Sequence, residues 1–301
     1  MTRSTTRPRP GQQQSYVVAL VGADLGTTLT PALHEREAGL QGLRYVYRTV
    51  DTAELGLSAG RVEQILPAAR WLGLAGLNVT HPFKQRVLPL LDEVSSDAAA
   101  IGAVNTVVIE DGCMVGHNTD WTGFAKSMQR GLPGADLGAV VLLGAGGAGS
   151  AVGYALLSLG AERVIVTDAR PDAADALVHS LAGRFGSARV SAVAIETIAD
   201  VLPDASGVVN ATPVGMAGQP GLPLPAGLLR SGLWVADVVY RPMATPLLAA
   251  ARELGCRTLA GGGMAVYQAA HALQLFTGID PDEQRMLAHL DELLALGESE
   301  R

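Results

Sequence analysis

The hexapeptide Gly-Ala-Gly-Gly-Ala-Gly that begins at Gly144 constrains the fold of this 301-residue chain more than any other feature. It follows an apolar run at residues 139–143 and precedes a helical pattern at residues 150–159. Gly144 permits a tight turn, Gly146 lets backbone amides approach a pyrophosphate, and Gly149 lets the helix pack closely on the strand. The amino end of the helix then faces the phosphates with its partial positive charge. This order of strand, glycine-rich turn and helix predicts a dinucleotide-binding unit.

A second strand pattern, at residues 163–167, is followed directly by Asp168. A carboxylate at this place accepts hydrogen bonds from the adenosine ribose hydroxyls and repels a 2′-phosphate. A site for the 2′-phosphate would carry arginine next, but Ala169 stands there and Arg170 comes one residue later. We therefore expect NAD as the cofactor, and NADP only if the Arg170 side chain turns back toward the ribose.

Short apolar runs alternate with longer helical stretches along the rest of the chain, and this alternation favours a parallel, doubly wound sheet in the second half. Further strands are expected at residues 16–21, 44–50, 76–79, 104–109, 113–116, 207–210 and 234–238, with 104–109 and 113–116 forming a hairpin. Helices are expected at residues 31–38 with Thr30 as the N-cap, at 59–72, at 121–130 and over most of 265–296.

We therefore predict an α/β fold of two domains, in which a Rossmann-type doubly wound nucleotide domain is inserted in an α/β substrate domain. The nucleotide domain is expected at residues 122–263, and the substrate domain at residues 15–121 plus 264–301. The C-terminal helices must then return to the first domain. Residues 1–14, rich in Thr, Arg, Pro and Gln, are expected to form a disordered tail.

The composition excludes several classes of partner. The net charge of −7 argues against nucleic acid and acidic membranes as partners. No apolar run is long enough to span a bilayer and no secretory signal is apparent, so the cytoplasm is the expected location. Cys113 and Cys256 lie far apart without ligand-like neighbours, so no metal site is expected and each thiol is interpreted as buried or incidental.

Lysine is rare in this chain: only Lys84 and Lys126 accompany twenty arginines. Arginine cannot release its proton in a protein, whereas lysine can when its surroundings favour release. Lys84 is therefore a candidate for proton transfer, against the alternative of an incidental surface lysine, which is the interpretation we give to Lys126.

Short polar segments of the first half have the composition of a pocket for a hydroxylated acid. Thr28 and Thr30 place two hydroxyls on one side of an extended loop. Thr80 adds a hydroxyl after a strand, Asn105 an amide and Asp120 a carboxylate. Each has a plainer interpretation, since threonines cap helices and Asp120 could be the N-cap of the helix expected from residue 121. Together they call for a common explanation.

Taken in order, these motifs resemble the shikimate/quinate dehydrogenase family from residue 16 to about residue 278, most closely its NAD-dependent quinate/shikimate members. The matching segments are Thr28–Pro31, Asn78–Lys84, Gly102–Thr106, Asn118–Asp120, Gly144–Gly149, Asn210–Met216, Asp237–Pro242 and Gly263–Gln268.

The resemblance implies a role for each matching residue. Lys84 and Asp120 would be the catalytic pair. Thr28, Thr30 and Tyr240 would hold the substrate carboxylate, while Thr80, Asn105 and Gln268 would bind ring hydroxyls. The cofactor-binding residues would be Gly144, Ala145, Gly146, Gly147, Ala148, Gly149, Asp168, Asn210, Thr212, Pro213, Gly215, Met216, Val238 and Gly261.

The implied reaction interconverts the hydroxyl and keto forms of a cyclohexane or cyclohexene carboxylic acid, namely shikimate/3-dehydroshikimate, quinate/3-dehydroquinate or both. The family commonly has Ser-x-Ser where this chain has Thr28 and Thr30, and this leaves the preferred acid open. An NADP-dependent biosynthetic shikimate dehydrogenase and an aminoshikimate or aminoquinate dehydrogenase remain alternatives. A non-catalytic sensor of NAD and a ring acid would be expected to lack Lys84 or Asp120. We expect a monomer or a homodimer.

Overall fold

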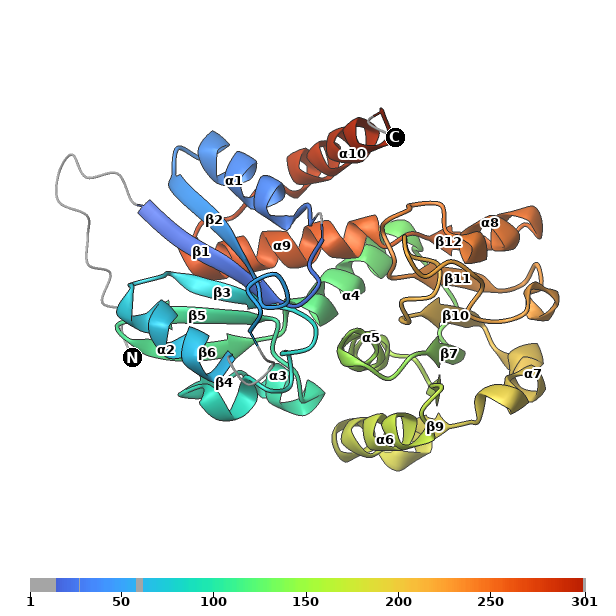
Figure 1. The fold of residues 1–301 in the computed structure, drawn as a ribbon. Coiled ribbons are helices and arrows are strands. Elements are labelled where there is room, and N and C mark those ends of the chain that lie inside the picture. The colour runs from blue at the N-terminus through green and yellow to red at the C-terminus, as the bar shows by residue number, and fades with distance from the viewer. Residues whose placement is uncertain (1–14, 27, 58–61, 300–301) are drawn as a thin grey trace.

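The computed structural model describes residues 15–26, 28–57 and 62–299. The tail expected at residues 1–14 lies outside the described residues, as does the start of the helix expected from residue 59. Over the described residues the chain forms two six-stranded sheets that lie side by side as separate lobes (Figure 1). The predicted mixed α/β class is confirmed.

The first sheet has the strand order β2-β1-β3-β5-β6-β4. Strands β1 to β3 run parallel, β5 is antiparallel to β3, β5 and β6 form the predicted hairpin, and β4 is parallel to β6. The strands are β1 (Ser15–Gly22), β2 (Arg44–Asp51), β3 (Gly76–Val79), β4 (Glu93–Val94), β5 (Thr106–Glu110) and β6 (Cys113–His117).

Helices cover both faces of this sheet. The apolar side chains of α2 and α3 pack on one face, and those of α1 and α9 pack on the other. All four residues of β3 are buried, as expected for a central strand with helices on both sides. These helices are α1 (Thr30–Leu40), α2 (Val62–Trp71), α3 (Ser96–Ile101), α9 (Gly262–Thr277) and α10 (Glu283–Ser299), the last of which packs on α1 and α9.

The second sheet is parallel throughout and has the order β12-β11-β10-β7-β8-β9. The strand order reverses between β7 and β10, which defines the switch point where doubly wound sheets bind nucleotides. The strands are β7 (Ala139–Leu143), β8 (Arg163–Thr167), β9 (Val190–Ala192), β10 (Gly207–Asn210), β11 (Trp234–Asp237) and β12 (Arg257–Leu259).

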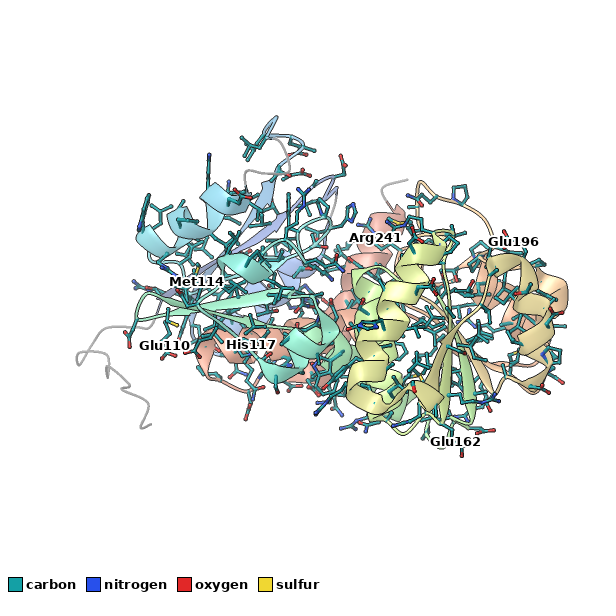
Figure 2. All side chains as sticks on the ribbon, turned by 90° about the horizontal axis from the view of Figure 1, so that it is seen from below. Glu110, Met114, His117, Glu162, Glu196 and Arg241 are labelled. Carbon is teal, nitrogen blue, oxygen red and sulfur yellow. The ribbon has the colours of Figure 1, made fainter. Side chains whose placement is uncertain are left out.

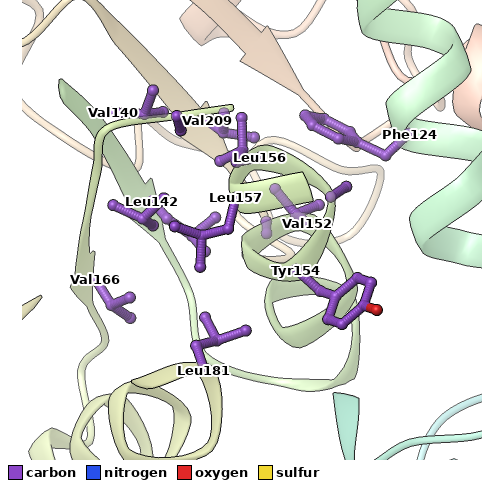
Figure 3. Close-up of a cluster of buried hydrophobic side chains, with 14 of the residues drawn as sticks. Phe124, Val140, Leu142, Val152, Tyr154, Leu156, Leu157, Val166, Leu181 and Val209 are labelled. Carbon is purple, nitrogen blue, oxygen red and sulfur yellow. The ribbon is translucent and has the colours of Figure 1, made fainter. Parts of the chain in front are cut away.

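The second sheet is also covered on both faces. On one face Val140 and Leu142 of β7 pack against α5 and α6, with Phe124 entering from α4 (Figure 3). On the other face Leu143 packs against the side chains of α7 and α8. The helices are α4 (Thr119–Gly131), α5 (Gly147–Ser158), α6 (Pro171–Phe185), α7 (Ile198–Val201) and α8 (Pro246–Glu253).

Two helices connect the lobes. Helix α9 leaves the second sheet and returns along the first, as expected, and α4 crosses beside it (Figure 1). Their backbones approach closely because Gly123 has no side chain: a Cβ there would lie 2.8 Å from the backbone nitrogen of Gln268. Within the described ranges, no helix is both long and apolar enough to cross a membrane.

One expected cap is wrong. Helix α1 begins at Thr30 itself, Leu29 occupies the N-cap position, and no side chain caps the helix there. The Thr30 backbone nitrogen instead donates to the Thr28 hydroxyl oxygen at 3.4 Å. The local bond between the two threonines replaces the cap and leaves their hydroxyls together.

Candidate active site

The polar segments of the first half meet at one edge of the first sheet. The carboxyl ends of β3 and β6 lie there together with the amino end of β5, since Asn78 is paired with Thr106 and Thr106 with His117. Loops that are far apart in sequence therefore leave the sheet side by side.

Lys84 and Asp120 form an ion pair at this edge. The Lys84 Nζ lies 2.6 Å from Asp120 Oδ2, and the two side chains are 18% and 10% exposed. The Lys84 backbone is fixed as well, because its carbonyl accepts a hydrogen bond from the backbone nitrogen of Val104 at 2.8 Å. The pair is thus mostly buried, and a small part of each side chain is open to solvent.

Asp120 is free to face Lys84 because another residue caps helix α4. The Asn118 side chain accepts hydrogen bonds from the backbone nitrogens of Asp120 and Trp121, at 3.1 and 3.3 Å. The alternative in which Asp120 is the N-cap is therefore wrong, as is the expected helix start at residue 121. The second carboxylate oxygen, Oδ1, accepts from Asn105 Nδ2 at 2.9 Å.

Thr28, Thr30 and Tyr240 are brought together from two lobes. The Thr28 hydroxyl donates to the Thr30 hydroxyl at 3.3 Å, and the Thr28 side chain lies close enough to Tyr240 to lower the pKa of its phenol against the larger effect of burial. Tyr240 follows β11 of the second sheet, and burial raises the pKa of its phenol, so the group remains a neutral donor at neutral pH. These hydroxyls suit a carboxylate, which accepts several hydrogen bonds at once.

The two remaining candidates for the ring acid lie around the same edge. Gln268 on α9 has its Oε1 3.4 Å from the Thr119 hydroxyl and donates from Nε2 to the backbone oxygen of Ala265 at 3.0 Å. Thr80 directly follows β3, and its backbone nitrogen donates to the backbone oxygen of Val21.

The glycine-rich turn has the close approaches that its sequence predicts. A Cβ on Gly149 would lie 2.0 Å from the Gly144 carbonyl oxygen, and Gly144 itself has a positive φ of 98° beside Ala211. Around Gly146, by contrast, a Cβ would meet no described atom within 4 Å. The turn is therefore tight where helix and strand pack and open where a pyrophosphate would approach, which fits a dinucleotide.

Asp168 is held at the end of β8 by backbone donors. Its two oxygens accept from the backbone nitrogens of Ala145 and Arg170, each at 2.8 Å. The Arg170 Nε lies 3.7 Å from Asp168 Oδ1, and its side chain is 76% exposed. Arg170 thus lies beside the carboxylate and remains largely in solvent.

A buried amide shapes the loop after β10. Asn210 accepts from the backbone nitrogen of Thr212 and from its hydroxyl, at 3.0 and 2.7 Å, and donates to the backbone oxygen of Val214 at 3.0 Å. Gly215 then turns the chain with a φ of 101° toward the exposed Met216. The loop that contains Pro213 is therefore folded around one side chain.

Asp237 was not singled out in the sequence, yet it holds three segments together. It accepts from Asn210 Nδ2 at 3.0 Å, from the Val239 backbone nitrogen at 3.0 Å and from the Thr245 hydroxyl at 2.7 Å. Burial raises its pKa to about 6 in spite of these donors. The backbone after Asp237 also contacts the start of α9, since a Cβ on Gly261 would lie 2.3 Å from the carbonyl oxygen of Val238.

The candidate catalytic lysine touches the nucleotide turn. A Cβ on Gly147 would lie 3.3 Å from Cδ of Lys84. Arg241, which follows Tyr240, lies where the second lobe faces the first, while Met114 and His117 mark the first lobe (Figure 2). Groups for a ring acid and for a dinucleotide therefore adjoin one another between the two sheets.

A separate hollow of about 340 Å³ opens between α4, α9 and the start of α10. Neither Asp120 nor Gln268 lines it. Lys126 lies there, 39% exposed, in an ion pair with Glu283 and 5.5 Å from the centre of the Tyr267 ring.

Comparison with known proteins decides the family. Residues 20–107 match the shikimate dehydrogenase substrate binding domain, and residues 261–290 match the shikimate 5′-dehydrogenase C-terminal domain. A shikimate dehydrogenase (NADP(+)) of Streptomyces avermitilis is 58% identical over 93% of this chain and 97% of its own. The chain belongs to the shikimate dehydrogenase family. It is accordingly an oxidoreductase of the class that acts on alcohols with a nicotinamide cofactor.

Other shikimate dehydrogenase relatives are named for NAD and for quinate. A quinate/shikimate dehydrogenase (NAD(+)) of Corynebacterium efficiens is 48% identical over 91% of this chain and 97% of its own. The structure of quinate dehydrogenase from Corynebacterium glutamicum in complex with NAD matches with a TM-score of 0.88 and 46% identity, over 93% of this chain and 100% of that one. The Rossmann-type nucleotide fold is confirmed by this likeness.

Several buried polar residues behind the site were missed as functional candidates. They are Tyr47, Asn78, Thr106, Thr119 and Asp237, all less than a tenth exposed. The available signal was the repeated pairing of Asn with Thr in the matching segments, because polar side chains at the end of a buried strand need partners.

Proposed function

We propose that this chain is an NAD-dependent dehydrogenase that interconverts the hydroxyl and keto forms of a ring carboxylic acid: shikimate/3-dehydroshikimate, quinate/3-dehydroquinate or both. The observation that carries the proposal is the Lys84–Asp120 ion pair, 2.6 Å long, with the lysine chain against Gly147 of the nucleotide turn. An ammonium and a dinucleotide turn so close together suit the joint transfer of a proton and a hydride.

In this proposal Lys84 moves the proton. Oxidation of a ring hydroxyl releases a proton from oxygen and a hydride from carbon, and bound NAD supplies the hydride acceptor. In reduction the Lys84 ammonium donates a proton from Nζ to the carbonyl oxygen, and in oxidation the neutral amine form of Lys84 accepts the hydroxyl proton and becomes the ammonium. Asp120 Oδ2 accepts a hydrogen bond from the Lys84 ammonium, and Asp120 Oδ1 accepts one from Asn105 Nδ2. The two bonds fix the orientation of the carboxylate and therefore the position of Lys84 Nζ.

The carboxylate of the ring acid is assigned to Thr28, Thr30 and Tyr240. Three neighbouring hydroxyls can donate to one carboxylate, and their joint origin from both lobes supports this placement. Ring hydroxyls are assigned to Thr80, Asn105 and Gln268. The methyl groups of the two threonines narrow this end of the site. We expect them to set the choice between shikimate, which has a flattened cyclohexene ring, and quinate, which has a puckered cyclohexane ring.

We favour NAD because Asp168 presents a fixed carboxylate after β8. Its two backbone hydrogen bonds prevent it from swinging away from the ribose, and a 2′-phosphate would meet its charge. NADP is the second candidate, supported by Arg170 beside the carboxylate and by the NADP-named relative at 58% identity. Asp168→Asn keeps an acceptor but removes the charge, so the ratio of NADP to NAD activity should rise by about tenfold or more.

The domains follow from these assignments. We assign residues 15–121 and 264–301 to the substrate domain and residues 122–263 to the nucleotide domain. The boundary at residue 121 then falls inside α4, which carries Asp120 in its first turn and packs on α5 of the second lobe. We assign the protein to the cytoplasm, as a monomer or homodimer.

The decisive experiment measures reduction of NAD and of NADP with shikimate, with quinate and with their amino analogues. Lys84→Ala should lower kcat by about 10²-fold or more, and Lys84→Arg should also fail because arginine cannot release a proton. Lys126→Ala, which removes the other lysine, is the matched control and should keep kcat. Near-normal turnover by Lys84→Arg would show that Lys84 supplies only a positive charge and does not transfer a proton. Binding of NAD and ring acid without turnover in the unmodified protein would favour a non-catalytic sensor.

A further inference from the structure

We infer that Thr106, supported by Asn78 and Tyr47, is a positioning residue that fixes the amide of Asn105 and through it the carboxylate of Asp120. The inference rests on the dehydrogenase activity proposed above. These three residues lie on strands β5, β3 and β2, and the hydrogen bonds described for them do not include Lys84.

The orientation of Asn105 is set by a backbone group. The Thr119 backbone nitrogen can only donate, and it lies 2.7 Å from Asn105 Oδ1. The oxygen of the amide must therefore face Thr119, and the nitrogen faces Asp120. Asn105 Nδ2 accordingly donates to Asp120 Oδ1 at 2.9 Å and to the Thr119 hydroxyl at 3.0 Å.

This orientation determines the direction of the next bond. The Thr106 hydroxyl lies 3.1 Å from Asn105 Oδ1, which cannot donate, so Thr106 donates to it. The Thr106 oxygen then needs a donor from elsewhere, and Asn78 Nδ2 supplies one at 3.1 Å. Thr106 thereby connects two amides with one hydroxyl.

The series ends at a tyrosine of β2, which is separated from β3 by β1. With its nitrogen toward Thr106, Asn78 presents Oδ1 to the Tyr47 hydroxyl at 2.8 Å, and Tyr47 donates. Every hydrogen bond from Tyr47 to Asp120 therefore points the same way, toward the carboxylate. Burial raises the pKa of Tyr47 well above its usual value, so the donor keeps its proton at neutral pH.

Burial makes the orientation strict. Thr106 is 0% exposed, Asn105 3%, Asn78 5% and Tyr47 5%, so water cannot replace a missing partner easily. A rotated Asn105 amide would place its oxygen against Asp120 Oδ1, and two acceptors in contact repel each other. The carboxylate would turn, and Lys84 would lose its direction with it.

A second branch of the same cluster reaches Gln268. The Thr119 hydroxyl accepts from Asn105 Nδ2 at 3.0 Å. Its oxygen lies 3.2 Å from Asn105 Oδ1 and 3.4 Å from Gln268 Oε1, and either of these two oxygens can accept its proton. The Thr106 hydroxyl lies 3.2 Å from the Thr119 hydroxyl. Loss of the Thr106 hydroxyl should therefore affect the ring-acid side of the site and leave the nucleotide side unchanged.

Substitution of Thr106 tests the inference. Thr106→Val keeps the shape and strand preference but removes the hydroxyl, whereas Thr106→Ser retains the hydroxyl. We expect Thr106→Val to lower kcat/KM for the ring acid by about tenfold, with KM for NAD unchanged, and Thr106→Ser to restore activity to within about twofold. Tyr47→Phe, at the far end, should give a smaller loss.

The control is Thr167→Val, which removes a buried hydroxyl that has no hydrogen-bond partner among the described residues and should leave kcat unchanged. A double-mutant cycle separates positioning from general loosening: on an Asn105→Ala background, Thr106→Val should cause no further loss. Thr106→Val with wild-type kcat/KM, or a full extra tenfold loss in the Asn105→Ala background, would overturn the inference.

An arm without turnover distinguishes this inference from the proposed function. Shikimate affinity is measured by calorimetry without cofactor, and the same order is expected: wild type and Thr106→Ser alike, Thr106→Val weaker. Equal affinity of all three overturns the positioning role even where turnover is absent. An unmodified protein that reduces neither NAD nor NADP would instead count against the dehydrogenase proposal.

Discussion

Cδ of Lys84 lies 3.3 Å from the position that a Cβ on Gly147 would occupy, so the candidate proton carrier rests on the first residue of the nucleotide-facing helix. The contact links the two halves of the proposed reaction without a hydrogen bond. A larger side chain at position 147 would displace Lys84, so substitution of Gly147 tests whether the position of the lysine matters for activity.

Gly147→Ala should lower kcat about three- to tenfold, because the added methyl displaces the Lys84 side chain by a few tenths of an ångström. Stability should be kept or raised, since alanine favours a helix over glycine by up to about 1 kcal/mol. The measurements are steady-state kinetics and thermal unfolding. The matched control is Gly183→Ala in α6, where a Cβ meets nothing within 4 Å, and it should raise stability without changing kcat.

The other glycines of the turn should separate binding from folding. Gly149→Ala places a methyl 2.0 Å from the Gly144 carbonyl oxygen and should lower the free energy of unfolding by about 2 kcal/mol or more. Gly146→Ala meets no described atom, so the unliganded protein should unfold as the wild type does while NAD binding weakens. Denaturant unfolding and calorimetry with NAD check both. Strong NAD binding by Gly146→Ala would contradict the assignment of this turn to the pyrophosphate.

His34 should make stability fall in mild acid. It is 0% exposed among aromatic rings, and burial lowers its pKa to about 3. The unfolded chain takes up a proton below pH 6.5 while the native imidazole does not, so the free energy of unfolding falls as pH falls from 6.5 toward 3. The slope is about 1.4 kcal/mol per pH unit from this residue. His34→Phe, or His34→Gln if the first does not fold, should flatten the slope in denaturant titrations, whereas the exposed His179→Gln should not.

Asp237 should change the pH dependence of stability in the direction opposite to that of His34. Its native pKa of about 6 lies above the ordinary value of 3.8, so the native carboxylate takes up its proton before the unfolded one. Lowering the pH from 7 to 4 therefore favours the native state by up to about 3 kcal/mol from this group. Asp237→Asn removes that gain, and the loss of stability between pH 6 and 4 should become steeper. An unchanged pH dependence in Asp237→Asn would show that the native carboxylate titrates normally.

Thr167→Val should stabilise the protein by about 1 kcal/mol, because the buried hydroxyl has no partner among the described residues and a methyl group costs nothing to desolvate. The comparison variant is Thr52→Val. Thr52 is equally buried, but its hydroxyl donates to the Gly22 carbonyl at 3.0 Å, so the same substitution should destabilise. Thermal unfolding of both variants is the measurement, and a destabilised Thr167→Val would reveal a hidden partner for that hydroxyl.

Strands buried on both faces were the most predictable part of the fold. Residues 76–79, 139–143, 163–167 and 207–210 form strands with the expected bounds, because central strands are continuous apolar runs closed by polar residues. The two- and three-residue strands β4, β9 and β12 have no such pattern and were not expected. They exist because a neighbouring strand offers free backbone groups.

The sequence predicted which residues lie at the candidate site better than it predicted the hydrogen bonds between them. Lys84 and Asp120 do meet, and the residues come to one edge because strand ends gather there. Asn118 and Asp120 are both good helix caps, so sequence could not decide which of them was free to face the lysine. The connection from Tyr47 to Asp120 spans several strands, and no local pattern encodes it.

The proximity of Thr28 in the first lobe to Tyr240 in the second suggests a further role for the ring acid proposed to bind there. In the proposed binding mode the carboxylate would contact groups from both lobes, so the bound acid would hold the two lobes together. The affinity for the ring acid would then depend on the distance between the two lobes. A solvent or substitution that moved the lobes apart would then weaken binding of the acid before it disturbed the proposed catalytic pair of Lys84 and Asp120.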